Sequence, residues 1–441
     1  MFSMKSKAMK GWINWSGLVS CTPRQIYYPE SVEEVRQLVK KAKQEKKTVR
    51  VVGSGHSFTP LVKTDQWLVS LDRLQGVKEI DTTKQIATIW AGTKLYQLGQ
   101  WLSELGFAQE NLGDINAQSV AGAISTGTHG SGMQFGSVST QLKALTIVTG
   151  NGDVISCSDE ENPMLFKAAQ VSLGALGIIV EVKLKVIPKY RLHYRSYRMS
   201  LDQCLQRLNT FVQENRHFEF FWFPHTDQVQ VKIMNQTDQP PTKNSIWNQT
   251  NKLVIENGAF WCLSEAVRLF PRLSRSVSRI SAKAVPTFEE INEGYLLFAT
   301  PRLVRFYEME YSIQAEKMAE AIKEIQSCIQ KFNFAVHFPI ECRYVKGDDI
   351  WLSSAYGRNS AYIAIHMYKG MPYQDYFIQV EEILKRFQGR PHWGKMHTMK
   401  VRELIECYPM WSEFLRVRSE LDPDGIFLNT YLRQLFGLEA Q

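Results

Sequence analysis

The sequence predicts an α+β protein with more than one domain. Its 441 residues exceed what one small hydrophobic core accommodates. Short β-branched runs alternate with amphipathic helical patterns up to about residue 190, after which aromatic residues become more frequent and strand-like runs predominate. We therefore expect one domain over residues 1–190 and a second over 191–392. Residues 393–441 are too few for a domain and should pack back onto the first one.

Two helices are predicted in the first domain. Ser31 and Glu34 form a capping-box pattern ahead of a helical apolar stripe. Thr93 is the expected N-cap of the second helix, and Gly106 marks its C-terminal end. The apolar stripe of the first helix comprises Val35, Leu38, Val39 and Ala42, and that of the second comprises Leu95, Leu98, Leu102 and Leu105.

Strands are predicted around these helices from β-branched runs bounded by turn residues. Residues 48–55 and 85–92 each form a strand that ends in glycine, and residues 145–157 form a hairpin around Asn151 and Gly152. A long strand over residues 174–188 should end at Pro188 and close the domain.

The second domain is predicted to contain a sheet covered by helices. Strands are expected over residues 304–313, 334–345 and 360–368, with a helix over 315–330 between the first two. The polar, proline-containing stretch 235–251 is interpreted as a surface loop.

Composition excludes several classes of function. The net charge of +8 comes from 52 basic and 44 acidic residues without a long basic block, which argues against nucleic-acid binding. Seven cysteines, an odd number without CxxC spacing, argue against a disulfide framework or a zinc site and favour a reducing compartment. With no signal-peptide pattern and no run of 18 apolar residues, we expect a cytoplasmic protein without an integral membrane segment. No pattern specifies an oligomeric state.

Two glycine-rich segments stand out. The first, "VVGSGHSF", places a Gly-x-Gly turn directly before His56, and the second, "SVAGAISTGTHGSG", covers residues 119–132 with few bulky side chains. Such backbone can approach a phosphate or a planar ring closely, although tight loop packing would explain it equally well. Neither segment matches a Walker motif or GxGxxG, which disfavours a P-loop nucleotidase or an ordinary Rossmann dehydrogenase.

Together these segments resemble the FAD-binding (PCMH-type) domain of the vanillyl-alcohol oxidase superfamily. The specific resemblance is to its aldonolactone oxidase and alditol oxidase branch, and it covers most of the chain because the C-terminal motifs "RPHWGKMH" and "LDPDGIFLNTYL" also resemble that branch. The resemblance implies a two-subdomain FAD-binding domain over 1–190 and an α+β, substrate-binding cap domain with an antiparallel sheet over 191–392.

The resemblance also implies FAD as the cofactor, with His56 as a covalent anchor to the flavin. Because no cysteine lies between Cys21 and Cys157, a single covalent bond is expected. Ser119 should face the substrate and His129 should support the flavin loop, with simple loop capping as the alternative for both. The implied cofactor-binding residues are Gly53, Ser54, Gly55, His56, Ser57, Ser119, Gly122, Ser125, Gly127, Thr128, His129 and Gly130.

The substrate side is predicted from strand periodicity as well. In "FAVHFPIECRYV" a period of two places His337, Glu341 and Arg343 on one face, as either a cavity wall or a solvated edge. The next predicted strand repeats the alternation and carries His366, which favours the cavity. The resemblance assigns the Glu-x-Arg pair to the active site and adds Lys395 and the strand that carries His366.

Each of these catalytic candidates has a chemical role in oxidising a carbinol. Glu341 would position or deprotonate the hydroxyl, and Arg343 would stabilise negative charge on the alkoxide or on the reduced flavin. Lys395 could share that second task, whereas His366 would bind substrate hydroxyls or relay the proton. No metal site is expected, because His392 and His397 lack a carboxylate at metal-ligand spacing.

The predicted activity is oxidation of a sugar-derived alcohol by hydride transfer to flavin N5. An L-gulono- or D-arabinono-1,4-lactone is the expected substrate, with O2 as the acceptor and hydrogen peroxide as the product. The alternatives are an alditol oxidase acting on a terminal hydroxyl, a dehydrogenase of the same fold with another acceptor, and a flavin-binding module without turnover.

Overall fold

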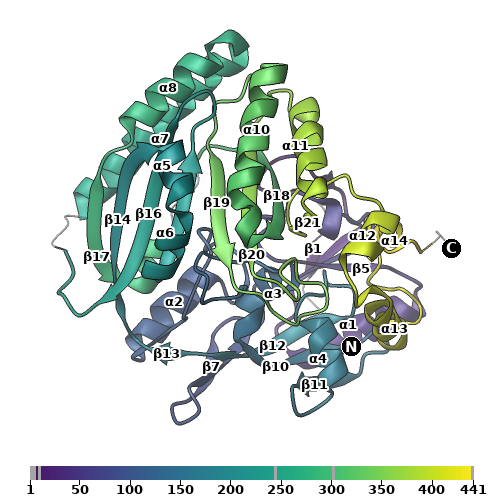
Figure 1. Ribbon diagram of the computed structural model, residues 1–441. Coiled ribbons are helices and arrows are strands. Elements are labelled where there is room, and N and C mark those ends of the chain that lie inside the picture. The colour runs from purple at the N-terminus through teal and green to yellow at the C-terminus, as the bar shows by residue number, and fades with distance from the viewer. Residues whose placement is uncertain (1–5, 8–10, 243–245, 300–302, 439–441) are drawn as a thin grey trace.

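The structure is a computed structural model that describes residues 6–7, 11–242, 246–299 and 303–438. Its main sheets have four, five and eight strands, and Figure 1 shows the eight-stranded sheet standing above the two smaller ones. Four short 3-10 helices supplement the α-helices of the described residues: Pro60–Val62, Val138–Gln141, Pro271–Leu273 and Ala315–Lys317.

The four-stranded sheet carries the first glycine turn. Strands β4, β6 and β5 run parallel, and β1 pairs with β4 antiparallel. Ser31 caps helix α1 as predicted, but the Glu34 carboxylate accepts from the Glu30 backbone N–H instead of closing the box on Ser31. The elements are β1 (Ser6–Lys7), β4 (Gln25–Tyr27), α1 (Val32–Gln44), β5 (Val49–Val52) and β6 (Trp67–Ser70).

The five-stranded sheet is antiparallel and has the order β11-β10-β12-β8-β7, which confirms the predicted hairpin. The prediction of Thr93 as a helix N-cap is wrong: Lys94 occupies that position, and the Thr93 hydroxyl accepts from the Gly76 N–H. The elements are β7 (Val77–Asp81), β8 (Ile86–Trp90), α2 (Leu95–Glu104), α3 (Val120–Ser125), β10 (Leu142–Val148), β11 (Val154–Ser158), α4 (Pro163–Ala169) and β12 (Ile178–Lys185).

Two short pairs complete this part of the chain: β2 (Trp12–Ile13) with β3 (Ser20–Cys21), and β9 (Phe107–Ala108) with β13 (Ile187–Pro188). The predicted long strand over 174–188 is therefore interrupted, because the chain leaves the sheet after Lys185 and its last residues pair with β9.

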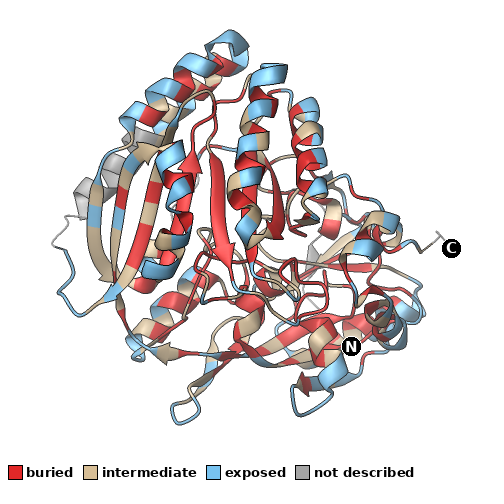
Figure 2. Cartoon of the chain, in the orientation of Figure 1, coloured by how far each residue is buried: buried red, intermediate tan, exposed pale blue. Residues whose placement is uncertain are grey.

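The eight-stranded sheet is antiparallel throughout and forms the cap, as the α+β prediction requires. Its central strands β19 and β20 are buried along their whole length (Figure 2). In sheet order the strands are β17 (Phe288–Glu293), β14 (Arg191–Ser200), β16 (Gln228–Thr237), β15 (His217–Trp222), β19 (Ile340–Val345), β20 (Ser360–Tyr368), β18 (Phe306–Gln314) and β21 (Arg390–Pro391). Its helices are α5 (Leu201–Gln206), α6 (Leu208–Glu214), α7 (Ile246–Leu269), α8 (Ser274–Ala284), α9 (Gly294–Phe298), α10 (Met318–Phe332) and α11 (Gln374–Arg386).

Two predictions in the cap need correction. The strand expected over 334–345 begins only at Ile340, after Pro339, which has no N–H to donate to a ladder. The stretch 235–251 is not all loop: its first residues end β16 and residues from Ile246 begin α7, while 243–245 lie outside the described residues.

The C-terminal segment contacts the first domain, as predicted, but also the cap, where the Thr398 N–H donates to Glu381 Oε1 at 2.7 Å. It contains α12 (Val401–Cys407), α13 (Trp411–Leu421) and α14 (Thr430–Phe436). The Asn429 amide donates to the carbonyl oxygens of Pro60 and Lys63, at 2.9 Å each, and the Val49 N–H donates to Ile426 O. Within the described residues, no helix has the length and apolar character needed to cross a bilayer.

Candidate active site

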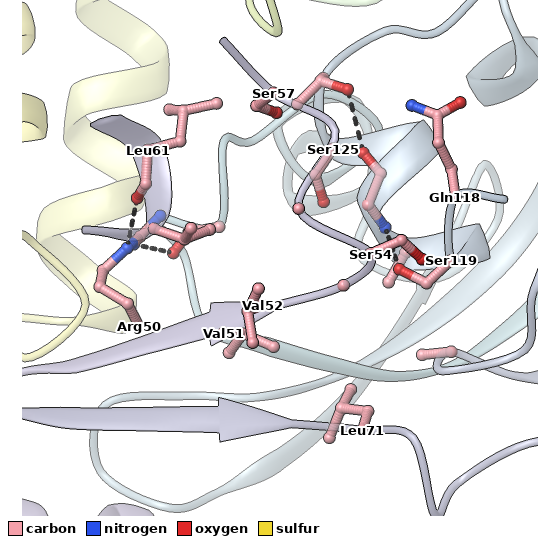
Figure 3. A pocket seen from close by; sticks show the side chains of 18 of the residues that line it. Arg50, Val51, Val52, Ser54, Ser57, Leu61, Leu71, Gln118, Ser119 and Ser125 are labelled. Carbon is pink, nitrogen blue, oxygen red and sulfur yellow. Dashed lines mark hydrogen bonds between the residues drawn. The ribbon is translucent and has the colours of Figure 1, made fainter. Parts of the chain in front are cut away.

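A long cavity lies between the turn after β5 and the start of α3 (Figure 3). It encloses about 980 Å³ of space, part of it open to solvent. Eight of the predicted cofactor-binding residues line it: Gly53, Ser54, Gly55, His56, Ser57, Ser119, Gly122 and Ser125. The two glycine-rich segments, more than 60 residues apart in the sequence, thus line one cavity together.

The glycines of the first turn are required by its geometry. A Cβ on Gly53 would lie 2.3 Å from Ser119 Oγ, which accepts from the Gly122 N–H at the start of α3. Gly55 has a φ of +69°, in the left-handed region that side chains rarely adopt. Because these two positions have no side chain, the backbone of the turn can form part of the cavity wall.

His56 lies where this cavity meets a second one and lines both. Its ring stacks on Trp15, with the ring centroids 5.9 Å apart. Burial, helped by the charges of Lys395 and Lys94, lowers the pKa of His56 to about 4. The imidazole is consequently neutral at pH 7 and retains a nitrogen lone pair.

The second cavity is polar and lies under the cap sheet; its space of about 450 Å³ is partly open to solvent. The first domain contributes His56, Ser57, Asp114, Ile115, Gln118, Thr126, Thr128 and His129, and the cap and C-terminal segment contribute Glu310, Arg343, His392, Gly394 and Lys395. Because the first domain, the cap and the C-terminal segment all line this second cavity, a substrate bound there would lie next to a ligand bound in the first cavity.

Glu310 of β18 lines this cavity, Glu308 of the same strand pairs with the lining residue Lys395, and neither glutamate was predicted from the sequence. Glu308 and Glu310 are two residues apart, so they share one face of the strand, and both are buried. Glu308 forms an ion pair with Lys395 and its Oε1 lies 3.5 Å from His366 Nε2, while Glu310 Oε1 lies 3.2 Å from His129 Nε2. The signal was present in "YEMEYS", where two acidic residues alternate with apolar ones in a predicted strand.

These charges stabilise one another against the cost of burial. Burial raises the pKa of Glu308, but Lys395 and His366 outweigh it and leave the pKa below its usual value. Burial likewise lowers the pKa of Lys395, but Glu308 and Glu310 raise it above the ordinary value. Both groups are therefore charged at neutral pH.

Lys395 is positioned by backbone hydrogen bonds. After β21 pairs with β18, the His392 and Met396 N–H groups donate to the carbonyl oxygens of Glu310 and Glu308, at 3.0 Å each. The Phe58 N–H donates to Gly394 O at 2.7 Å, which holds the same segment against the loop that follows His56.

Arg343 is the second cation of the site and is buried. Its Nε donates to Glu219 Oε2 at 2.9 Å, and its Nη2 lies 3.3 Å from Asp114 Oδ2 and forms an ion pair with Glu341. Burial opposes the charge, but Asp114, Glu341 and Glu219 raise the pKa of Arg343 well above its usual value.

The predicted catalytic residues fall into two pairs. Arg343 and Lys395 line the second cavity, whereas Glu341 and His366 line neither cavity and contact Arg343 and Glu308, respectively. His337, expected beside Glu341, lies outside β19 and its Nε2 bonds Ser264 Oγ at 3.0 Å, so it is not part of the site.

The predicted residues of the second glycine segment do not all line a cavity. Thr128 and His129 line the second cavity, but Gly127 and Gly130 line neither cavity, and Gly130 packs on the Leu112 backbone. Ser119, expected on the substrate side, lies in the first cavity and not in the second.

His129, Glu310 and His392 form the metal-capable group found among the described residues. The structure thus supplies His392 with the carboxylate that sequence spacing did not reveal. However, His392 Nδ1 accepts from the Gly394 N–H at 3.0 Å, which places the proton of the neutral ring on Nε2. Because Nε2 then lacks a free lone pair, we retain the prediction of no metal.

FAD fits the described residues. A glycine turn that excludes side chains can accommodate a diphosphate, and His56 stands between that cavity and one lined by two cations. Gly53, Ser54, Ser119 and Gly122 would hold the diphosphate.

Comparison with known proteins gives the same assignment. Residues 182–435 match the D-arabinono-1,4-lactone oxidase family, and residues 23–158 match an FAD binding domain. An L-gulono-1,4-lactone dehydrogenase from Mycobacterium tuberculosis is 39% identical over 426 residues, covering 97% of this chain and 99% of the relative. An L-gulonolactone oxidase from Scyliorhinus torazame is 35% identical over 432 residues, covering 96% and 97% of the two chains.

Among solved structures, cholesterol oxidase from B. sterolicum superposes with a TM-score of 0.83 at 16% identity, over 98% of this chain and 97% of that one, which shows a shared fold. The family match spans more than half of the chain, and relatives above 30% identity align over nearly all of it. The chain therefore belongs to the D-arabinono-1,4-lactone oxidase family of FAD-linked oxidoreductases.

Proposed function

We propose that this protein oxidises an aldono-1,4-lactone of the L-gulono or D-arabinono type at the carbinol carbon beside the carbonyl. The observation that carries the proposal is the convergence of Glu310, Arg343 and Lys395 on one cavity that opens onto His56. Relatives named for oxidation or dehydrogenation of such lactones support the choice of substrate.

The bound FAD would supply the acceptor for the hydride that leaves the carbinol carbon. The buried Glu310 carboxylate, held by His129, would accept a hydrogen bond from the substrate hydroxyl and orient it. Lys395 and Arg343 would stabilise the negative charge that develops on that oxygen, an interaction that is strong where water is excluded. Glu341 and His366 would be positioning residues, because Glu341 contacts Arg343, and His366 contacts Glu308, which pairs with Lys395.

The substrate class is tested by comparing rates on polyols and lactones. We expect kcat/KM for L-gulono- or D-arabinono-1,4-lactone to exceed that for xylitol by at least about tenfold. A site that hydrogen-bonds one substrate discriminates strongly against a ligand that leaves its buried polar groups without partners. Steady-state assays with a soluble dye as acceptor measure this ratio. Faster turnover of xylitol would assign the site to alditols instead, and no flavin reduction by any polyol or lactone would refute the enzymatic proposal.

Covalent attachment of the flavin through His56 is the second part of the proposal. Its neutral ring and its place between the two cavities support a bond from an imidazole nitrogen. After acid precipitation, we expect the yellow colour to remain with the wild-type pellet and to enter the supernatant for His56→Ala. Colour released from the wild type would exclude the covalent bond while leaving FAD as the cofactor.

We propose O2 as the electron acceptor, with hydrogen peroxide as the product, in the cytoplasm. The relatives include enzymes named oxidases and enzymes named dehydrogenases, so the acceptor is a matter for direct measurement. Oxygen consumption during lactone turnover, with catalase as a control, distinguishes the two. All seven cysteines are free in the structure, which supports a reducing compartment.

A further inference from the structure

A third cavity lies in the cap, between helix α8, helix α10 and the turn that joins β15 to β16. It encloses about 1530 Å³ of space, part of it open to solvent. The residues that line it are different from those that line the two cavities of the active site. Figure 1 shows α8 and α10 at the end of the cap that lies away from the FAD-binding domain. A ligand bound there would therefore be separate from the substrate and the flavin.

Four basic side chains line this third cavity. Arg275, Arg279 and Lys283 are spaced by four residues on α8, so they form one stripe along the helix. Arg198 of β14 lies beside the end of this stripe, because its Nη1 donates to Lys283 O at 2.9 Å. The four cations therefore lie around one space and not on separate faces of the cap.

No carboxylate of the described residues neutralises these four cations. The ion pairs that the described residues form in the cap include none of the four. Arg275 Nη2 donates instead to the neutral amide oxygen of Asn333 at 2.6 Å. Asp227 is the one acid among the described lining residues, and its Oδ1 accepts from the Gln228 amide at 2.9 Å. The third cavity thus has an excess of positive charge.

Helix α10 contributes uncharged side chains to this cavity. Gln326 and Gln330, four residues apart, line it with amide groups that can donate hydrogen bonds. The acidic residues Glu320 and Glu324 of the same helix line a different groove, between α10 and α11. Helix α10 therefore presents donors to the third cavity and places its carboxylates on another face.

The positive charge of this cavity opposes the stability of the fold. Like charges four residues apart on a helix repel each other, and Arg275 lies in the first turn of α8, where the helix dipole also disfavours a cation. The charge also acts on His225 in the β15–β16 turn: burial, together with Arg275 and Arg279, lowers the pKa of His225. A bound anion would relieve this repulsion, which the described side chains leave uncompensated.

We propose that the third cavity binds a soluble compound that carries two or more phosphate groups. The guanidinium group forms paired, charge-assisted hydrogen bonds with phosphate oxygens. Three cations at intervals of four residues extend over about 12 Å of helix, which exceeds the reach of one phosphate and suits two. A nucleic-acid strand fits less well, because these cations surround one cavity, whereas a strand needs basic residues along a continuous surface. The proposal does not depend on the lactone substrate.

Isothermal titration calorimetry of the holoenzyme with sodium pyrophosphate tests the proposal. The holoenzyme is used because FAD then occupies the first cavity, whose glycine turn would otherwise attract the same probe. We expect a single site that binds pyrophosphate at least about tenfold more tightly than inorganic phosphate at equal ionic strength, since two phosphate groups reach separate cations. The paired variant Arg275→Ala with Arg279→Ala should weaken pyrophosphate binding by roughly tenfold or more.

Lys323→Ala with Lys331→Ala is the matched control. Both lysines are exposed on α10 but line the groove between α10 and α11, so this variant loses the same charge outside the third cavity. It should bind pyrophosphate like the wild type. The arginine variant should unfold at no lower temperature than the wild type, because it removes a repulsion between like charges. Wild type that binds pyrophosphate no more tightly than phosphate, or equal losses of affinity in the two paired variants, would overturn the proposal.

Discussion

Replacing Lys395 by methionine should lower kcat/KM for the lactone substrate by roughly 10²- to 10³-fold. The Lys395 ammonium lines the second cavity and is fully charged through its ion pair with Glu308. Methionine fills a similar volume but cannot stabilise negative charge on the substrate oxygen. Anaerobic stopped-flow measurement of flavin reduction would place the loss in the reductive half-reaction.

Because Lys395→Met also leaves Glu308 buried without its cation, stability should fall by about 3 kcal/mol or more. The double variant Lys395→Met with Glu308→Gln removes both charges, so it should recover most of the stability while the rate stays low. Lys395→Arg keeps a cation and should be intermediate in rate. A double variant with restored flavin reduction would show that Lys395 acts only as a counterion.

Replacing Arg50 by methionine should reduce the free energy of unfolding by about 3 kcal/mol or more. Arg50 lies on β5 and is 2% exposed, and its guanidinium donates to the carbonyl oxygens of Leu61, Leu173, Gly174 and Phe427. These bonds join β5 to three distant segments, including the C-terminal one; the bond to Leu61 is seen in Figure 3. Methionine would leave the four buried acceptors without this donor.

Urea unfolding followed by tryptophan fluorescence measures this effect. Arg416→Met is the control, because Arg416 pairs only with Glu413 and Glu420 on the exposed side of α13 and should show no measurable change in midpoint. Since Arg50 lines the first cavity, Arg50→Met should also lower the retention of FAD. Unchanged stability would mean that water replaces the guanidinium without cost.

Much of the fold and part of the site followed from the sequence alone. Helix α1 with its Ser31 cap, the hairpin around Asn151 and Gly152, and strands β18 and β20 depend on local propensity and periodicity, which act over a few residues. The glycine turn before His56 was recognisable for the same reason, because its conformation is a property of the residues themselves. Resemblance to a family then indicated the cofactor and the Glu-x-Arg pair.

Only the tertiary structure decided which side chains meet. In the sequence, Glu308 and Glu310 are indistinguishable from the polar residues of an ordinary strand. Their role becomes visible only in the structure, where β18 lies beside β20 and the segment 392–396. Glu341 was expected to contact the substrate, but in the structure it pairs with Arg343. His337 lies outside the site because β19 begins only at Ile340, after Pro339. Sequence periodicity assigns a residue to a face of its own strand, but the partner of a buried charge is chosen by the sheet order. That order results from packing between strands up to 124 residues apart, and no local pattern encodes it.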